Sequence, residues 1–400
     1  MNIKDIIKNN SVLSKLLNVT AEEKFGEIYL VGGFIRDHFL GLKSNDIDLS
    51  VQKNASLFSE RLAKIFNAKI KHSQFNTYIV TNETIKIDIA GFRKESYLNP
   101  GSLPEITYTN KIYDDLLRRD FSINSIASSL KSFDLGEIID PLNGISDIKN
   151  NILRINHKLG FSDDPTRIFR AIRYSNKYNI KIDADTEKYI YKHKKFIKNI
   201  SGKRIVNELN LLLLENNYST YFEKLSKYNI LDEIHKDFIT YFQNEPVYNN
   251  ENFRIKKIYL LTKNIDNNVA NKLEEISTEF SEWSNGIRLN NIYKNIKFEK
   301  NISLSELHIL LKDFPKEFLI IKQQIEKRVI VKNYITNYIN KISKIRMYIN
   351  GTDLLNIGFQ KGPIIGKILD EIYIKKLNDE INSKFDELNY ALKIKNQRLP

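Results

Sequence analysis

The spacing of hydrophobic residues changes character about one third of the way along the chain. In the first ~140 residues, alternating runs such as EIYLVGG and TIKIDIAG predict strands, interleaved with segments of helical spacing. Beyond about residue 145 the periodicity is helical almost throughout, as in DPTRIFRAIRYSNKY, KRIVNELNLLLLENN and GPIIGKILDEIYIKKL. The pattern therefore predicts an α+β fold, in which a mixed-sheet head with helices is followed by an all-α remainder.

Four hundred residues exceed what one hydrophobic core usually serves, so we expect between two and four domains. The polar, proline-containing segment 239–253 is typical of a joint, and a softer boundary falls near 298–306. We predict four regions along the chain: a head over residues 1–140, a helical neck over 141–215, a helical body over 216–330 and a helical tail over 331–400.

Composition narrows the class of protein. A hydrophobic content of 42% with 28% charged residues is typical of a soluble globular chain, and no apolar run is long enough for a membrane span. The absence of cysteine excludes disulfides and thiolate metal sites and is consistent with the cytoplasm. The formal net charge of +13 favours a polyanionic partner such as nucleic acid, although a Lys- and Asn-rich genome is the alternative explanation.

A glycine turn follows the first predicted strand, residues 28–31. The next segment, FIRDHFLG, has helical spacing, with Gly41 as its expected stop. A strand, a glycine turn and a helix start together present backbone N–H groups to an anion. We expect Gly32 and Gly33 to let the backbone approach a triphosphate, and Arg36 to add a cation. A Gly-Gly pair alone is more often only a tight turn.

Two aspartates lie just beyond this turn, in NDIDLSV. On a strand Asp46 and Asp48 would point to one face, while Ile47 and Leu49 would point to the other. Two carboxylates this close repel each other unless a cation neutralises them, and hard oxygen ligands suit Mg²⁺. The alternative is an exposed strand edge with two solvated aspartates.

A third carboxylate favours the metal interpretation. In TIKIDIAG the alternation places Asp88 opposite Ile87 and Ile89, so Asp88 would join Asp46 and Asp48 if the two strands are neighbours. Three carboxylates around two metal ions are typical of phosphoryl and nucleotidyl transfer. One ion would lower the pKa of an attacking hydroxyl, and the other would stabilise the leaving pyrophosphate.

The stretch LVGGFIRDHFLGLKSNDIDLSV, residues 30–51, resembles the first motif of the class II tRNA nucleotidyltransferases. This family comprises the CCA-adding enzymes and bacterial poly(A) polymerases of the polymerase-β superfamily. Further similar motifs follow in the family's order and cover at least residues 28–215. The resemblance implies a polymerase-β-like head, Mg²⁺ as cofactor, and tRNA, CTP and ATP as partners.

The segment DDLLRRDFSINSIA, residues 114–127, resembles the next family motif. The resemblance implies that Arg119 contacts the nucleotide, while Asp120 and Asn124 position its sugar. A structural ion pair is the alternative for any one of these residues. The residues themselves predict a helix that begins after Asp120 and has an apolar face made by Phe121, Ile123 and Ile126.

The segment FSDDPTRIFRAIRYSNKY, residues 161–178, predicts a helix with Asp164 as N-cap and Pro165 at its first position. Arg167, Arg170 and Arg173 recur every third residue and share one broad face, which is also compatible with a basic surface helix. By resemblance, Asp164 and Arg167 act as a protein template for the incoming base. Arg170 and Arg173 then lie along the triphosphate or the nearby helix.

The chemistry of such a template follows from hydrogen bonding. Cytosine and adenine each carry an amine donor beside a ring-nitrogen acceptor, which match a carboxylate and a guanidinium. Uracil and guanine carry the reverse pattern and would leave both protein groups unpaired. One Asp/Arg pair can therefore accept CTP and ATP and reject UTP and GTP.

Three activities within the family compete: complete CCA addition, partial addition (A only or CC only) and poly(A) synthesis. Residues 91–117 contain a Gly- and Pro-containing loop of full length, which in this family favours complete or A-only addition. A non-catalytic RNA-binding protein would not need the three carboxylates. A small-molecule nucleotidyltransferase would not need RRDFSIN or the Asp/Arg helix. We therefore expect complete CCA addition to tRNA, with the other two activities as alternatives.

Overall fold

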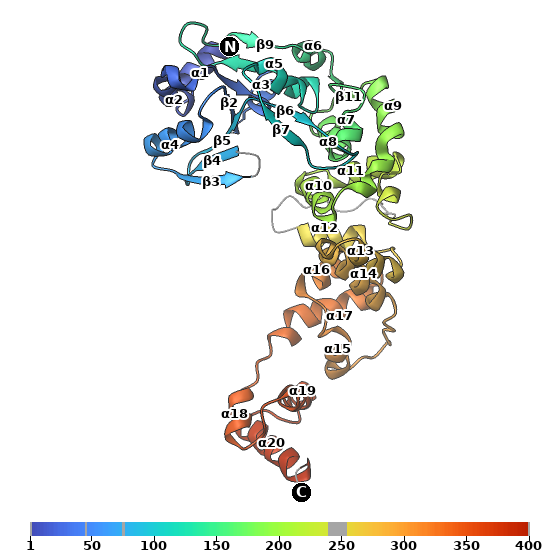
Figure 1. Cartoon of the computed structure of the whole chain (residues 1–400). Coiled ribbons are helices and arrows are strands. Elements are labelled where there is room, and N and C mark those ends of the chain that lie inside the picture. The colour runs from blue at the N-terminus through green and yellow to red at the C-terminus, as the bar shows by residue number, and fades with distance from the viewer. Residues whose placement is uncertain (1, 45, 74–76, 239–253, 399–400) are drawn as a thin grey trace. The chain divides into compact units, whose positions relative to one another are not determined.

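The chain divides into two compact units, Met1–Phe242 and Gln243–Pro400, which are described separately (Figure 1). The predicted head, neck, body and tail boundaries are finer than this division and stay predictions. No helix in the described part of the chain is long and apolar enough to cross a membrane. The computed structural model describes residues 2–44, 46–73, 77–238 and 254–398.

A seven-stranded mixed sheet forms the centre of the first unit, as the period-2 runs predict. Its strand order is β3-β4-β5-β2-β1-β8-β9. Within the described part of this sheet, β2 and β5 run parallel and the other neighbouring strands run antiparallel. The strands are β1 (Ile28–Val31), β2 (Ile47–Val51), β3 (Lys69–Ser73), β4 (Thr77–Thr81), β5 (Lys86–Gly91), β8 (Ala127–Ser129) and β9 (Ile138–Ile139).

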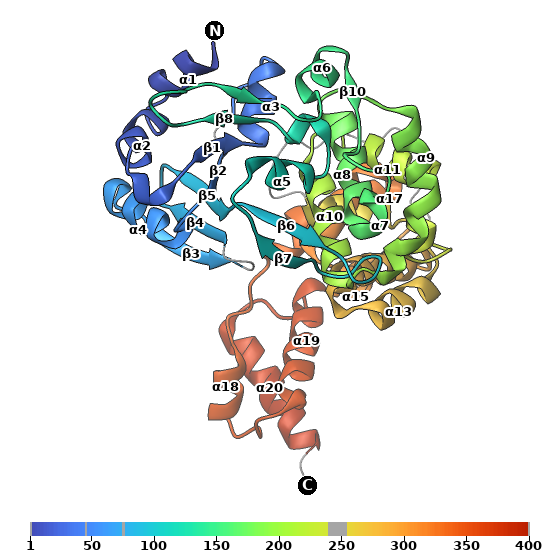
Figure 2. The ribbon, with the colours of Figure 1, turned by 45° about the horizontal axis from the view of Figure 1, so that its top comes forward.

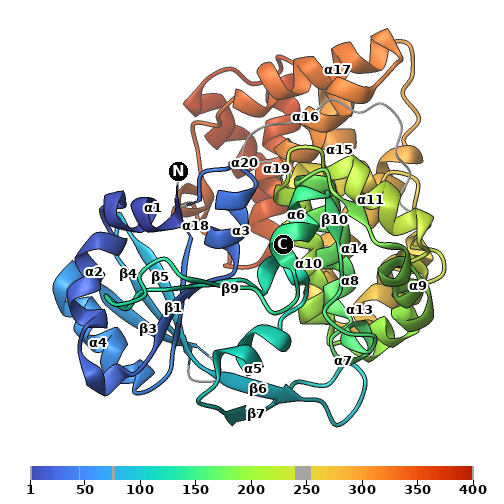
Figure 3. The same ribbon diagram turned by 90° about the horizontal axis from the view of Figure 1, so that it is seen from above.

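Helices cover one face of this sheet, while the other face carries the polar side chains and is covered in part by α5 (Ile112–Leu117), whose Ile112 and Leu116 pack with Tyr29 and Val31. Helix α4 (Ala55–Phe66) packs against β3, β4 and β5, and α2 (Leu13–Thr20) packs against α4 (Figure 3). Alternation along the strands buries Ile87 and Ile89, which are fully inaccessible. Each such side chain contributes about 1.5–3 kcal/mol of burial free energy. The intervening carboxylates therefore face the opposite side.

The remaining elements of the first unit lie beside the sheet (Figure 2). A hairpin of β6 (Arg93–Ser96) and β7 (Glu105–Tyr108) extends from the end of β5. Its loop reaches residues 160–163, where the Gly101 N–H donates to the Ser162 carbonyl at 3.1 Å. The helices are α1 (Ile3–Asn9), α3 (Gly33–Phe39), α5 (Ile112–Leu117), α6 (Gly144–Lys149), α7 (Gly160–Asp163), α8 (Thr166–Lys177), α9 (Ala184–His193), α10 (Gly202–Leu214) and α11 (Tyr218–Lys227). Strands β10 (Ile152–Leu153) and β11 (Lys181–Ile182) form a small parallel pair.

The helix predicted after Asp120 is wrong. The chain makes a single 3-10 turn there, η3 (Ser122–Asn124), and then enters β8. Because β8 pairs with β1 and an isolated bridge links Phe121 to Ile155, strand pairing uses backbone groups that a longer helix would need. The apolar side chains expected to be buried are nevertheless fully buried: Phe121, Ile123 and Ile126.

Helix α8 runs from Thr166 to Lys177, and Pro165 just before it already has helical dihedrals (φ −64°, ψ −14°). Asp164 is extended (φ −131°, ψ 94°) and follows the end of α7. A residue before proline is sterically driven out of helical geometry, as a capping residue must be. Asp164 Oδ1 accepts a hydrogen bond from the Thr166 N–H at 3.0 Å, so it satisfies a free donor at the helix start, as the sequence predicts.

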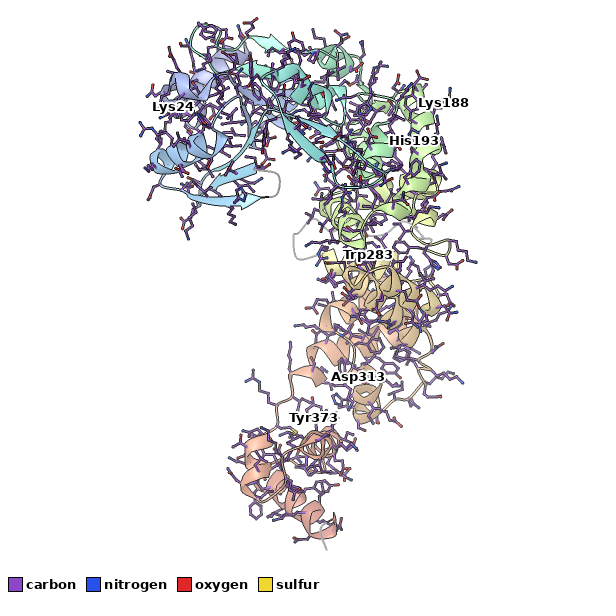
Figure 4. All side chains as sticks on the ribbon, in the orientation of Figure 1. Lys24, Lys188, His193, Trp283, Asp313 and Tyr373 are labelled. Carbon is purple, nitrogen blue, oxygen red and sulfur yellow. The ribbon has the colours of Figure 1, made fainter. Side chains whose placement is uncertain are left out.

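The second unit is all-helical, as predicted. One core cluster gathers side chains from α12 and α14 through α17, and another gathers α18 to α20. Trp283 on α14 is fully buried, and Pro363 occupies the first turn of α19 (Figure 4 labels Trp283). The predicted joint, 239–253, lies outside the described residues. The helices are α12 (Arg254–Leu261), α13 (Asn267–Ile276), α14 (Ser281–Lys294), α15 (Leu304–Leu311), α16 (Lys316–Ile325), α17 (Val329–Asn340), α18 (Gly351–Asn356), α19 (Pro363–Leu377) and α20 (Lys384–Arg398).

Candidate active site

An open cavity of about 520 Å³ lies in the first unit, beside the polar face of the sheet. It gathers residues from the glycine turn, strands β2 and β5, the segment after α5, and helix α8. Every residue that the sequence singles out, except Arg173, lines it. These lining residues are Gly32, Gly33, Arg36, Asp46, Asp48, Asp88, Arg119, Asp120, Asn124, Asp164, Arg167 and Arg170.

The glycine turn joins β1 to α3 at one edge of the cavity. Gly32 has φ 69°, a left-handed conformation that glycine adopts without strain. A Cβ built there would lie 3.0 Å from Arg119 Nη1 and 3.4 Å from Asp48 Oδ2. A larger residue would therefore displace either the arginine or the carboxylate. Gly41, with φ 72°, follows the end of α3, as predicted.

The carboxylates meet because β2 and β5 are parallel neighbours, which confirms the strand adjacency that the sequence left conditional. Asp48 and Asp88 are register partners across the two strands, and Asp46 directly precedes β2. Burial raises the pKa of Asp48, and the negative charges of Asp88 and Asp46 raise it further against the opposing charge of Arg119. Lys86 pairs with Asp88 at 2.8 Å.

This donor set fits a divalent cation. A cation beside Asp46 and Asp48 would relieve the repulsion that raises the pKa of Asp48. Within the described ranges, no group of three or more His, Cys, Asp or Glu side chains forms a ready-made metal site. Mg²⁺ commonly binds one or two carboxylates and takes its other ligands from substrate phosphates and water, so two carboxylates are sufficient.

Asp115 on α5 was not predicted from the sequence, yet it organises the arginines of the next segment. Its side chain is fully buried and accepts from Arg118 Nε at 3.0 Å and from Arg119 Nη2 at 3.1 Å. Burial alone would raise the pKa of Asp115, but the charges of Arg118 and Arg119 outweigh it and lower the pKa. The i,i+3 and i,i+4 spacing to the two arginines was the available signal.

Asp120 and Asn124 are held in a continuous hydrogen-bonded chain. Asn124 Nδ2 donates to Asp120 Oδ1 at 2.9 Å, and Arg170 Nε donates to Asp120 Oδ2 at 2.7 Å. Burial would raise the pKa of Asp120, but the Arg170 charge and these hydrogen bonds lower it to about 2. Both residues therefore have protein partners, and the sugar contact implied by resemblance stays a prediction.

Arg36 is bound within the same network. Its Nη1 donates to Asn124 Oδ1 at 2.7 Å, and its Nη2 pairs with Asp37 at 2.7 Å. The guanidinium also lies 4.5 Å from the ring centroid of Tyr178 and 5.3 Å from that of Tyr174 on α8. Arg36 thus ties α3 to α8 while it lines the cavity, and its triphosphate contact stays a prediction.

Asp164 and Arg167 stand side by side at the start of α8. Arg204 Nη2 donates to Asp164 Oδ1 at 2.7 Å, whereas no hydrogen bond from the described residues reaches Oδ2. Arg167 is 5% exposed and donates from Nη2 to the Arg118 carbonyl at 2.8 Å. Its Nη1 is buried and has no partner among the described residues. Each side chain is therefore held by one atom and keeps another for a ligand.

Two further residues change the predicted picture of α8. Arg173 does not line the cavity; its guanidinium lies 5.4 Å from the Tyr174 ring centroid. Glu208 on α10 does line the cavity, and burial raises its pKa against the charges of Arg170 and Arg173. Sequence reasoning missed Glu208 because its position facing α8 depends on how two helices pack.

Comparison with known proteins agrees with this geometry. Residues 28–154 match the family described as "Poly A polymerase head domain". Residues 179–241 match the one described as "Probable RNA and SrmB- binding site of polymerase A". The fold and the site together resemble those of nucleotidyltransferases of the polymerase-β type.

Full-length relatives extend the match. The A-adding tRNA nucleotidyltransferase of Geobacter sulfurreducens is 29% identical over 92% of this chain, which spans only 45% of that relative. The enzyme of the same name from Halalkalibacterium halodurans is 28% identical, over 97% of this chain and 93% of the relative. A solved CCA-adding enzyme in complex with CTP is 26% identical with a TM-score of 0.73, over 98% of this chain and 97% of that one. In sequence and fold the chain is therefore similar to the class II family of CCA-adding enzymes and bacterial poly(A) polymerases.

Proposed function

We propose that this protein adds nucleotides to the 3′ end of tRNA without a nucleic-acid template. The observation that carries the proposal is the juxtaposition of Asp48 and Asp88, register partners on parallel strands, with the Asp164/Arg167 pair around one cavity. The tRNA-acting relatives and the formal net charge of +13 support an RNA substrate. A tRNA substrate would also be consistent with a cytoplasmic location for the protein.

In the proposed reaction the terminal 3′ hydroxyl of the RNA attacks the α-phosphate of a nucleoside triphosphate. A new bond joins the 3′ oxygen to the α-phosphorus while the hydroxyl proton passes to water, the bond from the α-phosphorus to the bridging oxygen breaks, and pyrophosphate leaves with that oxygen. Asp46 and Asp48 would hold Mg²⁺, which supplies a lowered pKa for the hydroxyl and charge neutralisation at the phosphates. Asp88, in register with Asp48, would orient the attacking hydroxyl.

Base selection would rest on Asp164 and Arg167. Oδ2 of Asp164 would accept from the exocyclic amine of cytosine or adenine, and Nη1 of Arg167 would donate to the adjoining ring nitrogen. Uracil or guanine would face the carboxylate with a carbonyl and leave both protein groups unpaired. Each buried unpaired group costs about 1–3 kcal/mol, enough to reject the wrong base by a factor of ten or more.

The nucleotides that are added form the finer part of the proposal. Two relatives that match nearly the whole chain are named A-adding enzymes, whereas the matching CTP complex is of a CCA-adding enzyme. Transfer of AMP is common to both activities, so we propose it as the core reaction. Complete CCA addition is the second candidate, and the full-length loop in residues 91–117 is compatible with it as well as with A-only addition.

The test uses three radiolabelled tRNAs that end before CCA, after the first C and after CC. Each is incubated with Mg²⁺ and with CTP, ATP or both, and product length is read on a sequencing gel. A-only addition extends only the third tRNA by one residue, complete addition restores all three, and poly(A) synthesis gives a ladder. A chain that extends none of them would overturn the proposal.

Variants test the residue roles in the same assay. Asp164→Ala should lose discrimination against UTP, while Asp163→Ala, a neighbouring acid that does not line the cavity, should keep it. Asp48→Asn should abolish transfer with every nucleotide. Wild-type discrimination in Asp164→Ala would contradict the base-reading role, and full transfer in Asp48→Asn would contradict the metal role.

A further inference from the structure

The fully buried carboxylate of Asp115 is divided between two arginines. Its Oδ1 accepts from Arg118 Nε and Nη2, at 3.0 and 2.7 Å. Its Oδ2 accepts from Arg119 Nη2 at 3.1 Å and from the Ser50 hydroxyl at 3.0 Å. Asp115 itself does not line the cavity, so it is placed to act on the site through the side chains it binds.

Arg119 lies between this buried carboxylate and the carboxylate of Asp48. Its Nη1 and Asp48 Oδ2 both approach the position of a Cβ on Gly32, at 3.0 and 3.4 Å. Despite this proximity, the ion pairs of the described residues include one between Arg119 and Asp115 and none between Arg119 and Asp48. Arg119 Nε is buried and has no partner among the described residues, so the guanidinium is not saturated.

Asp115 and Asp48 lie in different environments, which explains why Arg119 pairs with Asp115. Asp115 is fully buried and Asp48 lies at an open cavity, so the attraction between opposite charges is screened less at Asp115. The Ser50 hydroxyl donates to Asp115 and accepts from Arg119 Nη2 at 3.4 Å. Ser50 lies two residues beyond Asp48 on β2, so one strand carries both the open carboxylate and the brace for its cationic neighbour.

We propose that Asp115 is a positioning residue that keeps Arg119 from pairing with Asp48, so that Asp48 stays free for a divalent cation. This inference rests on the proposed function, because it assigns Asp48 a metal ligand's role. A guanidinium paired with Asp48 would occupy carboxylate oxygens that the metal needs. Asp115 retains the guanidinium beside the cavity, where Nη1 can meet a phosphate, without a direct ion pair between Arg119 and Asp48.

Neutralising Asp115 should therefore weaken metal binding at a distance. In Asp115→Asn the guanidinium of Arg119 loses its charged partner, and Asp48, whose Oδ2 flanks the same point beside Gly32 as Arg119 Nη1, becomes available as another. The apparent dissociation constant of Mn²⁺, used alone as a probe in place of Mg²⁺, should rise on the order of tenfold, the scale of one charge-assisted hydrogen bond. The binding is measured from the electron paramagnetic resonance signal of free Mn²⁺, with the full chain and without tRNA or nucleotide.

The matched control is Asp147→Asn. Asp147 is also a buried carboxylate, bound by the Ser122 hydroxyl at 2.6 Å and by Arg154 Nε at 3.2 Å, but it does not line the cavity. Both variants remove the charge of a buried carboxylate that is paired with arginine, so both should lower the unfolding temperature, although the Arg154 side chain is 44% exposed. Only Asp115→Asn should change Mn²⁺ affinity. Equal Mn²⁺ affinity in Asp115→Asn and wild type would overturn the inference.

A double variant separates positioning from general damage. If Arg119 is what obstructs the metal, Asp115→Asn combined with Arg119→Gln should bind Mn²⁺ within about twofold of Arg119→Gln alone. Persistent weak binding in the double variant would overturn the inference. Ser50→Ala gives a milder perturbation that removes one hydrogen bond to Asp115, and it should shift Mn²⁺ affinity in the same direction. If Asp115→Asn does not fold, an unchanged Mn²⁺ affinity in Ser50→Ala would overturn the inference.

Asp48→Asn distinguishes this inference from the proposed function. If wild type and Asp48→Asn bind Mn²⁺ equally, the metal role of Asp48 fails, and the inference fails with it. If Asp48→Asn binds more weakly while Asp115→Asn matches wild type, the proposed function stands and only the role of Asp115 is wrong.

Discussion

Replacing Asp120 with asparagine tests how much the buried network around α8 stabilises the first unit. The side chain of Asp120 is 7% exposed and binds Arg170 and Asn124. Its pKa falls from the ordinary 3.8 to about 2, since the Arg170 charge and the hydrogen bonds outweigh burial. This difference corresponds to about 2.5 kcal/mol of stability at neutral pH.

The loss of unfolding free energy in Asp120→Asn should be at least this large. Asparagine keeps the shape of the side chain but leaves the Arg170 guanidinium without its charged partner, and breaking a buried pair costs about 3–5 kcal/mol. Because the folded state binds the Asp120 proton less tightly than the unfolded chain, the contribution is complete above about pH 5. It declines as pH falls toward 2, so the difference between variant and wild type should shrink by about 1 kcal/mol, roughly half of the 2.5 kcal/mol, between pH 7 and pH 3.

Urea unfolding provides the assay, with circular dichroism as the probe of the whole chain. The only tryptophan, Trp283, lies in the second unit, so its fluorescence provides an internal reference. Asp120→Asn should move the dichroism transition of the first unit to lower urea and leave the Trp283 transition in place. Asp185→Asn, an exposed acid on α9, is the control and should move neither. Equal transitions in Asp120→Asn and wild type at pH 7, or an undiminished difference at pH 3, would refute the reasoning.

Three further changes have defined outcomes. Gly101→Ala should lower the free energy of unfolding by about 1–3 kcal/mol, because Gly101 has φ 82° and a Cβ there would lie 3.1 Å from a neighbouring side chain. The β6–β7 loop should then be cleaved faster in limited proteolysis. Arg204→Gln should weaken discrimination between ATP and UTP, because Arg204 holds Asp164 at 2.7 Å; unchanged discrimination in a competition assay would contradict this. Glu387→Gln should lower the free energy of unfolding by about 3–5 kcal/mol, because Glu387 is fully buried and pairs with Lys376. Faster hydrogen exchange at the Tyr348 and Ile349 amides, which donate to Glu387, would confirm this loss.

Much of the site was predictable because its key residues obey local rules. Alternation along a strand places Asp48 opposite Leu49, whatever the rest of the chain does. A glycine at the end of β1 and three arginines at helical spacing are equally local signals. Their meeting at one cavity required in addition that β2 and β5 be neighbours, although β3 and β4 separate them in sequence.

The errors have a common cause in long-range contacts. The apolar spacing in RRDFSIN is compatible with a helix, but the pairing of β8 with β1 limits it to one 3-10 turn. Arg173 shares the helical spacing of Arg167 and Arg170, yet its position along α8 places it outside the cavity. Spacing defines a face of a helix, whereas packing decides how much of that face borders a given cavity.

The amino-acid sequence alone determined the change from a strand-and-helix region to a helical region and the faces on which Asp48 and Asp88 point. Both follow from backbone geometry over a few residues, whereas the resemblance to a known family came from the motifs themselves. The tertiary structure decided which charges are paired: Asp115 with Arg118 and Arg119, and Asp120 with Arg170. Pairing depends on burial, and burial arises only when segments distant in sequence exclude water from the same place.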